Sequence, residues 1–312
     1  MKASIIIVNW NGADLLCKGL PSVMKSVSYA GNEHEIIVVD DGSTDESVKV
    51  IEQFSGIKLI ALPQNRGFGA ACNIGAAESQ NAIVIVLNND VIVEENFIIP
   101  LLEAFEDPGI FAVSCKIKKW DKETVEIGRT CGRFSCGFIS IKRDNLGSPS
   151  ITLQPTFYAS GGAVAYDKGK FLQLGGFDPL YYPFYWEDND LSYRAWKRGW
   201  EVLYQPHSVV YHQHQGTIGR SFSKSYIKTI YYRNKLLFVW KNITDVSYLF
   251  QHLICLIPYL LGTMLIGRVH NMRGFFAALK FVPVVLQRRT QEKQSGKVSD
   301  REIFHNHSQK TR

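Results

Sequence analysis

The sequence contains few cysteines, and their spacing suits neither a metal centre nor a set of cross-links. Six cysteines are spread over 312 residues, and only Cys131 and Cys136 lie near each other. Structural zinc sites use Cys-x-x-Cys pairs and small disulfide-bonded domains use dense cysteine frameworks, neither of which occurs in this sequence. The pattern therefore predicts reduced thiols in a cytosolic protein.

The N-terminal segment lacks the features of a secretory signal peptide. It reads MKASIIIVNWNG and passes from a short β-branched run directly into polar residues, without a long apolar region or a small-residue cleavage site. We interpret it as the first strand of a globular domain. With 46% hydrophobic residues, the chain can bury one large core or two smaller ones.

Positive charge is in modest excess and is unevenly spread. The net charge is +6, and Lys and Arg gather near Arg268 and Arg288, beside the most apolar part of the chain. This combination favours an anionic membrane surface as a partner. The aromatic and basic segment 225–242 has too few and too widely spaced cations for a nucleic-acid patch. We therefore expect no nucleic-acid partner and interpret this segment as a helix leading to the membrane-proximal end.

Short apolar runs alternate with stretches long enough for helices in the first third of the chain. This alternation is typical of an α/β fold with a parallel sheet and helices on both faces. The runs lie at residues 4–8, 35–39, 58–62 and 82–87, and the helical stretches at residues 13–17, 44–54 and 69–79.

Polar residues follow each run at the point where the strand would end. The carboxyl ends of parallel strands meet at one edge of a sheet, where ligands of α/β proteins bind. The sequence therefore predicts a binding crevice at this edge. The strand-end residues are Asn9, Asp40, Asp41, Asn65, Arg66, Asn88, Asn89 and Asp90.

The pattern weakens between residues 111 and 155. The segments CGRFSCGF and RDNLGSPS are rich in glycine, serine and polar residues, and we interpret them as turns or a mobile loop. After residue 155 we expect a strand with a glycine pair, a helix and a turn. Further strands are expected at residues 201–204 and 209–212.

The C-terminal part is more apolar. Residues 247–267 have the length of a membrane span, which needs about 20 apolar residues, but they include a glutamine, a histidine and a proline. Residues 274–286 form a second, shorter apolar run. We favour a pair of in-plane or re-entrant membrane helices, with a transmembrane segment or a soluble helical bundle as alternatives. The polar tail, residues 291–312, is predicted to be disordered.

Acidic residues at the strand ends suit different tasks. Asp41, Ser43 and Asp45 suit a turn that caps a following helix. Asp40, at the strand end itself, can accept hydrogen bonds from a ligand such as a pyrimidine N–H or a ribose hydroxyl. Asp90 can bind a hard divalent cation together with phosphate oxygens.

Three further acids follow an aromatic segment. Glu187, Asp188 and Asp190 come directly after Tyr185 and Trp186, at the start of a helical pattern. The helix macrodipole stabilises acids at a helix N-terminus, which is sufficient reason for one or two of them. A carboxylate in this position can also take a proton from an attacking hydroxyl group. The two aromatic rings can form an apolar platform for a sugar.

Six segments, in their order and spacing, resemble the family 2 glycosyltransferases with a GT-A fold, in particular the bacterial rhamnosyltransferase-like branch. The resemblance covers about residues 3–240 and implies a Rossmann-like mixed central sheet flanked by helices. The segments are SIIIVNWNG, IIVVDDGSTD, NRGFGAACNIGA, VLNND, SGGAVAYDKGKFLQLGGFD and YWEDNDLSYRAWKRGW.

The resemblance implies a nucleoside-diphosphate sugar as the donor and inversion at the anomeric carbon in one displacement. Asp40 and Arg66 would bind the nucleotide, with Val8, Asn9 and Asn88 beside it.

It also implies a divalent metal, Mg²⁺ or Mn²⁺. The triplet Asn88-Asn89-Asp90 occupies the position of the family's Asp-x-Asp metal motif, with an asparagine in place of the first acid. Asp90 would then be the main carboxylate ligand. His212 is our first choice for the histidine that completes the metal site, and His214 the second.

On the acceptor side, the resemblance selects Asp188 as the base that takes the proton of the acceptor hydroxyl. Its neighbours would bind or orient the acceptor, with the tryptophan as the ring platform. These acceptor-side residues are Gly161, Gly162, Trp186, Glu187 and Asp190.

The expected function is transfer of rhamnose or another hexose to a lipid-linked or growing cell-surface glycan, at the cytoplasmic face of a bacterial inner membrane. The expected organisation is a catalytic domain (1–240, with a nucleotide-sugar half at 1–110 and an acceptor half at 155–220), membrane-associating helices (241–290) and the tail (291–312).

Two other functions fit parts of the pattern. A non-catalytic nucleotide-sugar-binding subunit of a glycan-assembly complex would keep Asp40 and Arg66 but would not need the acid pair Glu187-Asp188. A nucleotidyltransferase would need a basic glycine-rich loop near the N-terminus, whereas residues 10–17 contain no Lys or Arg.

Overall fold

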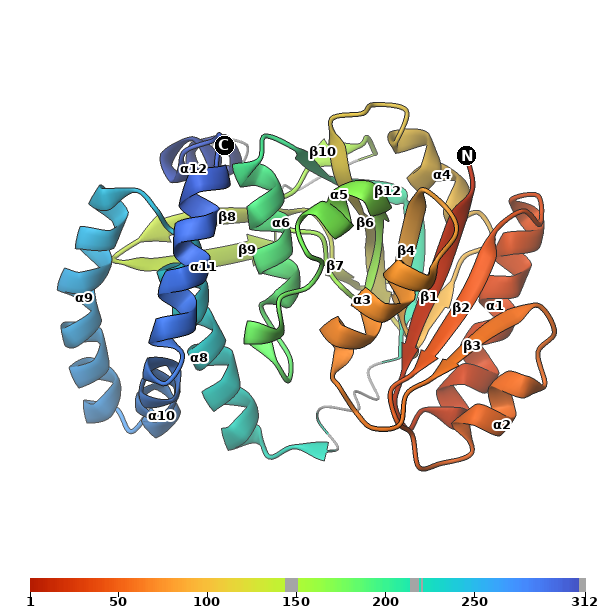
Figure 1. The fold of residues 1–312 in the computed structure, drawn as a ribbon, viewed down its shortest axis with the longest axis horizontal. Helices are drawn as coiled ribbons and strands as arrows, with labels where there is room; N and C mark the ends of the chain where they lie inside the picture. The colour runs from red at the N-terminus through yellow and green to blue at the C-terminus, as the bar shows by residue number, and fades with distance from the viewer. Residues whose placement is uncertain (144–150, 214–218, 220, 309–312) are drawn as a thin grey trace.

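The computed structural model describes residues 1–143, 151–213, 219 and 221–308. Its first third confirms the predicted alternation of strands and helices, with β1 between β2 and β4 in a parallel arrangement and β3 beside β2 (Figure 1). The strands are β1 (Ala3–Asn9), β2 (Glu35–Asp40), β3 (Ile57–Ala61) and β4 (Ile83–Asn88), and the helices are α1 (Ala13–Tyr29), α2 (Ser47–Glu52) and α3 (Phe68–Glu78).

Helix α1 continues well past residue 17, where we expected it to end, and passes through Pro21. Leu16, Leu20, Val23 and Val27 are buried at a spacing of three to four residues, which places them on one face of the helix. Burial of this face against the sheet offsets the hydrogen bond that the proline cannot make.

Beyond β4 the sheet contains strands of both directions, as the mixed sheet of the predicted fold requires. β11 (Ala163–Asp167) lies between β4 and β6 (Ile110–Lys119) and is antiparallel to both. β6 then pairs in parallel with β12 (Glu201–His212). The order is β10-β12-β6-β11-β4-β1-β2-β3, where β10 is Gln154–Pro155, and the short strands β5 (Val91–Val93) and β7 (Val125–Ile127) pair with β12 and β6.

Helices cover both faces of this sheet because successive side chains of a strand point to opposite sides. Ile5 and Ile7 of β1 belong to the core shared with α1 and α4 (Ile98–Ala104). Ile6 belongs to the core shared with α3, α5 (Lys168–Gln173) and α6 (Glu187–Lys197). The two layers leave the strand ends as the place where polar side chains gather.

The strand pattern, which weakens in the sequence between residues 111 and 155, continues in the structure, and the interpretation of CGRFSCGF as a turn or mobile loop is wrong for most of its residues. β6 occupies the start of this range, and CGRFSCGF forms a hairpin of β8 (Thr130–Ser135) and β9 (Phe138–Arg143). Cys136 and Gly137 have φ values of 49° and 76°, and their flanking residues pair. A two-residue turn with positive φ at both positions matches the twist of a hairpin. Residues 144–150, the rest of the second predicted loop, lie outside the described residues.

The two strands predicted at 201–204 and 209–212 are parts of one strand, β12. Its register with β6 shifts between Gln205, which pairs with Cys115, and Val209, which pairs with Lys116. Pro206 lies in this irregularity, where a missing backbone N–H does not interrupt the ladder. Because a proline seldom occurs inside a strand, the sequence predicted two strands where the structure has one.

The polar tail is helical as far as the structure describes it, so the prediction of disorder is wrong for residues 291–308. Helix α11 ends at Ser295, and α12 follows. Asp300 is fully buried, and Phe304 packs on Phe157 with 5.9 Å between ring centroids. The prediction of disorder rested on the many charged and polar residues of the tail, whereas a few apolar side chains of α12 contact the core. The C-terminal helices are α8 (Lys224–Asn242), α9 (Val246–Leu265), α10 (Val269–Leu279), α11 (Val282–Ser295) and α12 (Asp300–Ser308).

Figure 1 shows these helices gathered at the end of the molecule opposite β3. α8 runs across residue 240, where we had placed the end of the catalytic domain. Among the described residues, α9 is the one helix that is long and apolar enough to cross a membrane. One side of α9 is docked on the protein through His252, which accepts a hydrogen bond from Trp240 Nε1 (2.9 Å) and donates one to the carbonyl of Gly137 (2.6 Å).

We expect Asp300→Ala to destabilise the protein by about 3–5 kcal/mol, because the substitution leaves the buried Lys197 ammonium without its partner at 2.7 Å. Asp300 also accepts hydrogen bonds from Tyr193 Oη and from the backbone N–H of Thr244. Urea unfolding of the full chain measures the difference, with the exposed Glu302→Ala in the same helix as a control. Equal stabilities of the two variants would show that α12 is not part of the folded core.

Candidate functional site

The ends of β1, β2 and β4 are joined by a network of side-chain hydrogen bonds. Asn9 and Asp40 lie opposite each other in the sheet, and Asn9 Nδ2 donates to Asp40 Oδ1 (2.8 Å). Asn89 Nδ2 donates to Asn9 Oδ1 (2.7 Å). A side chain at residue 12 would collide with this network, because a Cβ atom on Gly12 would lie 2.2 Å from Asn89 Nδ2. The structure thus brings together three of the predicted strand-end residues.

Asp40 is 2% exposed, and protein groups already occupy its oxygens. Besides Asn9, the hydroxyl group of Ser43 donates to Oδ1 (2.6 Å) and the Ser43 N–H donates to Oδ2 (3.0 Å). In this structure Asp40 organises the turn after β2, and its contact with a nucleotide stays a prediction. Val8, predicted to lie beside the nucleotide, is buried and pairs with Asn88 of β4.

Asp41, which we interpreted as a local turn residue, holds a more distant loop. Its carboxylate accepts hydrogen bonds from the backbone N–H groups of Arg66 (2.7 Å) and Gly67 (2.8 Å). Burial raises the pKa of the Asp41 carboxyl group, and these two donors oppose the rise. The Arg66 side chain is left exposed at the strand-end edge, just before α3.

Asp90 and His212 are brought together by the pairing of β5 with the end of β12. His212 pairs with Val91, and the Gln213 N–H donates to the carbonyl of Asp90 (2.8 Å). His212 Nε2 lies 3.1 Å from Asp90 Oδ2. The structure therefore places our first-choice histidine beside the predicted metal carboxylate. His214, the second choice, lies outside the described residues.

Glu126 of β7 completes this cluster, and sequence reasoning missed it. Its Oε2 lies 3.1 Å from His212 Nδ1. Burial lowers the pKa of His212, but the hydrogen bonds to Asp90 and Glu126 and their charges outweigh it and raise the pKa to about 9. The pairing of β7 with β6 positions Glu126. This contact joins residues that are distant in the sequence, so no local motif identifies Glu126 as part of the cluster.

Asp90 and His212 form a hydrogen-bonded ion pair whose carboxylate and imidazole are donor groups that a divalent cation can also use, although within the described residues no group of three His, Cys, Asp or Glu side chains converges on a metal position. Two neighbouring ligands of an octahedral Mg²⁺ at 2.0–2.1 Å stand about 3 Å apart. The separation of Asp90 Oδ2 from His212 Nε2 matches this value. Asp90 Oδ1 is buried and has no hydrogen-bond partner among the described residues.

Glu187 and Asp188 begin helix α6 and lie partly exposed at the other side of the strand ends. Asp188 Oδ2 accepts a hydrogen bond from the Gly161 N–H (3.2 Å), and Oδ1 accepts from the Asn189 N–H (2.7 Å). Burial raises the pKa of the Asp188 carboxyl group against these donors. Glu187 Oε2 is buried without a partner among the described residues, and burial together with the Asp188 charge raises the Glu187 pKa.

Gly161 and Gly162 connect the acid pair to the strand ends. While Gly161 holds Asp188, the carbonyl of Gly162 accepts a hydrogen bond from the Asn88 N–H (3.0 Å). A Cβ atom on Gly161 would lie 3.2 Å from the Phe68 ring, so little room exists for a larger residue. Because the glycines are consecutive, Asp188 and the VLNND segment lie on the same edge of the sheet.

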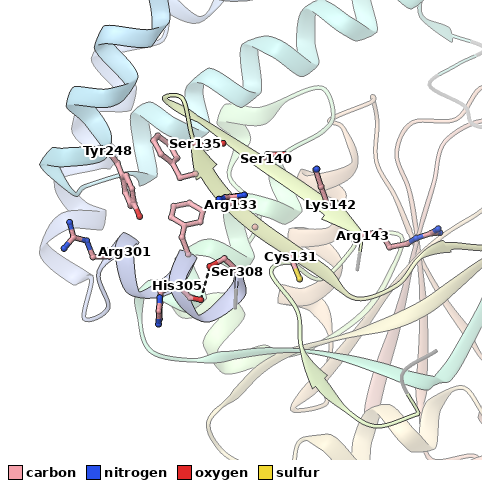
Figure 2. A pocket seen from close by; sticks show the side chains of 13 residues that line it. Cys131, Arg133, Ser135, Ser140, Lys142, Arg143, Tyr248, Arg301, His305 and Ser308 are labelled. Carbon is pink, nitrogen blue, oxygen red and sulfur yellow. Dashed lines mark hydrogen bonds between the residues drawn. The ribbon is translucent and has the colours of Figure 1, made fainter. Parts of the chain in front are cut away.

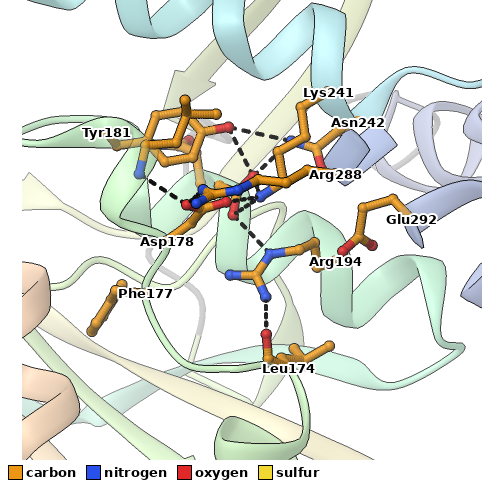
Figure 3. A network of polar contacts seen from close by, with 12 residues as sticks. Leu174, Phe177, Asp178, Tyr181, Arg194, Lys241, Asn242, Arg288 and Glu292 are labelled. Carbon is orange, nitrogen blue, oxygen red and sulfur yellow. Dashed lines mark hydrogen bonds and ion pairs between the residues drawn. The ribbon is translucent and has the colours of Figure 1, made fainter. Parts of the chain in front are cut away.

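The assignment of Asp190 to the acceptor site is corrected by the structure. Asp190 is fully buried and is bonded to Arg194 Nε (2.7 Å) and Lys241 Nζ (2.8 Å). Figure 3 labels Arg194, Lys241, Asn242 and Tyr181 within this network of polar contacts. Asn242 and Tyr181 also donate to its Oδ1. Two residues correspond to about 200° around a helix, so Asp190 points away from the face that carries Asp188.

Trp186 is not an open platform for a sugar ring in this structure. It is 4% exposed and packs on Tyr231 and Phe238, with 5.7 Å and 5.3 Å between ring centroids. Tyr185 is 37% exposed, so it is the member of the aromatic pair that solvent reaches. The left-handed backbone at both residues, with φ of 72° and 78°, decides which ring turns inward and could not be read from the sequence.

Two cavities lie at different positions relative to the acid pair Glu187 and Asp188. A small one of about 40 Å³ lies between the Arg66 loop, Tyr182 and Glu187. A larger one of about 1070 Å³ lies between the β8–β9 hairpin and α12 (Figure 2). Basic side chains such as Arg133 and Arg301 line the larger cavity, and its described lining includes no carboxylate. Glu187 lines the small cavity, so the carboxylate predicted to lie on the acceptor side faces this space and not the larger one.

The family model of glycosyl transferase family 2 matches residues 4–171, more than half of the chain. The chain belongs to this family. The match covers the network of Asn9 and Asp40, the Arg66 loop, Asp90 and the glycine pair, while the acid pair lies just beyond it. It confirms the resemblance seen in the sequence.

Curated relatives are glycosyltransferases at low identity. The O-antigen chain rhamnosyltransferase RfbN of Salmonella typhimurium is 25% identical over 227 residues, which are 72% of this chain and 70% of that protein. The undecaprenyl-phosphate 4-deoxy-4-formamido-L-arabinose transferase of Proteus mirabilis is 29% identical over 163 residues, 46% of this chain and 49% of that protein. The pre-mycofactocin glycosyltransferase of Mycobacterium tuberculosis is 28% identical, and this chain spans 37% of its length.

Solved structures confirm the predicted GT-A type of fold. GalNAc-T7 with UDP, GalNAc and Mn²⁺ has a TM-score of 0.63 at 22% identity, covering 78% of this chain and 48% of that one. The mannosyltransferase PcManGT of Pyrobaculum calidifontis, with GDP-Man and Mn²⁺, has a TM-score of 0.57 at 15% identity, covering 99% and 86%. At these identities the likeness concerns the fold.

We expect Glu187→Gln to stabilise the protein by about 1–3 kcal/mol at pH 7.5. The unfolded carboxyl group ionises with a pKa of about 4.3, whereas the folded one has a pKa raised to about 8. Folding then requires proton uptake between these values, so the parent loses stability as the pH rises through this window. Glutamine does not ionise, so the variant does not lose this stability as the pH rises.

Urea unfolding at pH 5 and pH 7.5 measures this effect. The gain from Glu187→Gln should grow with pH, whereas the exposed Glu52→Gln should change stability equally at both values. A gain that does not depend on pH would contradict a raised pKa for Glu187.

Proposed function

We propose that this protein is an inverting glycosyltransferase that uses a nucleoside-diphosphate sugar and transfers the sugar to a hydroxyl group of a glycan acceptor. The observation that carries the proposal is that two consecutive glycines contact both sides of the site. The Gly161 N–H donates to the carboxylate of Asp188, and the Gly162 carbonyl accepts a hydrogen bond from Asn88, beside the Asp90–His212 pair. These contacts support a proton acceptor placed next to a site for a diphosphate leaving group.

In the proposed reaction, the acceptor hydroxyl oxygen attacks the anomeric carbon as the bond to the nucleoside diphosphate breaks. The hydroxyl proton passes to a carboxylate oxygen of Asp188, a contribution of roughly 10²–10⁴ in rate. The raised pKa of Asp188 makes it a better base than an exposed aspartate. Arg66, exposed at the donor edge, would bind the charged nucleotide, with Asp41 holding its backbone in place.

Asp90 and His212 would hold a divalent metal, Mg²⁺ or Mn²⁺, together with the donor diphosphate. When bound, such a cation neutralises the charge that develops on the leaving group. Glu126 would orient the His212 ring through Nδ1, as carboxylates do behind metal-bound histidines. Mn²⁺ in GalNAc-T7 and PcManGT, which share this fold, supports the proposal.

The donor sugar would be rhamnose or another hexose, and the acceptor a lipid-linked or growing cell-surface glycan. The support is the similarity to RfbN, a rhamnosyltransferase of the O-antigen chain, and to a transferase that acts with undecaprenyl phosphate. Such an acceptor would place the protein at the cytoplasmic face of the bacterial inner membrane.

Helix α9 supports a peripheral attachment in the plane of the membrane. Its histidine faces the protein, while an apolar stripe with helical spacing faces outward. A helix with one apolar face and one docked polar face suits the membrane interface better than a span, because a spanning helix would contact lipid all round. The outward side chains, each more than half exposed, are Val246, Phe250, Leu253, Ile254, Ile257, Leu261, Met264 and Leu265.

We expect Asp188→Asn to lower the transfer rate by roughly 10²–10⁴-fold while donor binding is retained, because the amide cannot accept the proton but keeps the shape. Transfer to an acceptor is measured with a panel of nucleoside-diphosphate sugars, and donor binding by thermal stabilisation with Mn²⁺ or Mg²⁺. Asp14→Asn, at an exposed site on α1, is the control.

The two measurements together separate the candidate functions. A variant as active as the parent would remove Asp188 as the base. A parent that is stabilised by a donor but transfers nothing would favour the non-catalytic subunit, for which the asparagine at position 88 of the metal motif is the supporting feature.

We expect the double variant Leu253→Ser, Ile257→Ser to bind anionic phospholipid vesicles at least about tenfold more weakly than the parent, because two exposed apolar side chains no longer enter the interface. Vesicle co-sedimentation measures the bound fraction. The control is Gln291→Ser, Gln294→Ser on α11, which exchanges two exposed polar residues. Equal binding of both double variants would exclude α9 as the attachment surface.

A further inference from the structure

The backbone immediately before the acid pair has an unusual conformation. Tyr185 and Trp186 both have positive φ, 72° and 78°, and α6 starts at the next residue. Residues other than glycine rarely adopt this left-handed region, and two in succession persist only where the surrounding structure holds them. The orientation of Glu187 and Asp188 therefore depends on whatever fixes this loop.

The buried side chain of Asn234, in α8, holds this loop in its conformation. Asn234 is 0% exposed, and its side-chain Nδ2 lies within hydrogen-bond distance of three carbonyl oxygens of the loop. They belong to Tyr181 (2.9 Å), Phe184 (2.9 Å) and Tyr185 (2.8 Å). The side-chain amide of Asn234 therefore contacts carbonyl groups on both sides of the bend in this loop.

Arg233 sets the orientation of this amide. Arg233 Nε donates to Asn234 Oδ1 (2.9 Å), and a second guanidinium nitrogen donates to the carbonyl of Tyr182. Guanidinium groups only donate and carbonyl oxygens only accept, so the Asn234 oxygen must face Arg233 and its nitrogen must face the loop. The two consecutive residues of α8 therefore bind four of the carbonyl groups between Tyr181 and Tyr185.

We propose that Asn234 is a positioning residue for catalysis, which acts by holding the loop that aims Asp188 at the acceptor hydroxyl. This inference rests on the proposed function of Asp188 as the base. The donor-side groups are held by other elements: Arg66 by Asp41, and Asp90 by the pairing of β5 with β12. Tyr182 of the loop lies against Gly67 of the donor side, but Asp41 holds the Arg66 and Gly67 backbone independently of Asn234. Loss of the Asn234 amide should therefore displace the acid pair more than the donor site.

Two variants test the role of the amide. Asn234→Ala removes the hydrogen bonds, and Asn234→Asp keeps the shape but replaces the donating nitrogen by an oxygen that faces carbonyl oxygens. We expect both to lower kcat by about 100-fold, the effect of a displacement of about 1 Å at a reacting group. The donor KM should stay within about twofold of the parent value. Asn234→Ser, with one remaining donor, should recover part of kcat and serves if Asn234→Ala does not fold.

Asn271→Ala is the matched control. Asn271 is 2% exposed in α10, and its Nδ2 donates to the Tyr259 hydroxyl group of α9 (2.9 Å) and not to a carbonyl of the loop. This variant also loses a buried amide from the C-terminal helices, and we expect it to lower the melting temperature while kcat stays within about twofold of the parent. A similar loss of kcat in both variants, or a donor KM that rises with the loss of kcat, would overturn the proposal.

Hydrogen exchange provides a readout that does not depend on activity. Amides of residues 181–188 should exchange at least about tenfold faster in Asn234→Ala and Asn234→Asp than in the parent and in Asn271→Ala. Unchanged exchange would overturn the role of Asn234 in holding the loop. A parent without transfer activity on any donor would instead contradict the proposed function, whatever the exchange shows.

Discussion

The ion cluster around Asp190 determines how helix α6, which begins with Glu187 and Asp188, is attached to the rest of the molecule. A fully buried carboxylate is costly unless cations and hydrogen-bond donors surround it, and here Arg194, Lys241, Asn242 and Tyr181 do so. Lys241 and Arg194 hold the pKa of Asp190 well below its usual range despite burial. Because Arg194 lies in α6 whereas Lys241 and Asn242 lie in α8, the cluster fixes these helices against each other. This contact and the loop bonded to Asn234 together set the orientation of Glu187 and Asp188.

Much of the fold was predictable because its signals are local. β-branched runs separated by helical stretches specified four parallel strands, and the rule that ligands bind at strand ends selected Asn9, Asp40 and Asp90 before any contact was known. The position of His212 near Asp90 was also predicted, but from the resemblance to the family's strand-end histidine and not from the strand pairing that brings the two residues together. The strands are correct to within one or two residues because period and composition act within the same short segment.

The remaining features depend on partners far along the chain. Asp190 looked like an acceptor-site acid because Lys241, one of its two cations, lies 51 residues later and belongs to what seemed a separate region; the other cation, Arg194, is in the same helix. Glu126 was missed for the same reason, being 86 residues from His212. The tail seemed too polar to fold, yet one buried carboxylate, Asp300, and a few apolar side chains of α12 dock it. Such pairings exist only after the chain has folded.

Helix α8 has a consequence for how the protein can be divided. It carries the residues that hold the loop before the acid pair, the cation opposite Asp190, and the surface against which α10 and α11 pack. A chain shortened to residue 240 would lack Lys241 and Asn242, and the buried Asp190 carboxylate would lose one of its two cations and keep Arg194. The part of the chain before residue 240 and the C-terminal helices are thus not separable modules, because α8 packs on both and contacts the loop that precedes Glu187 and Asp188.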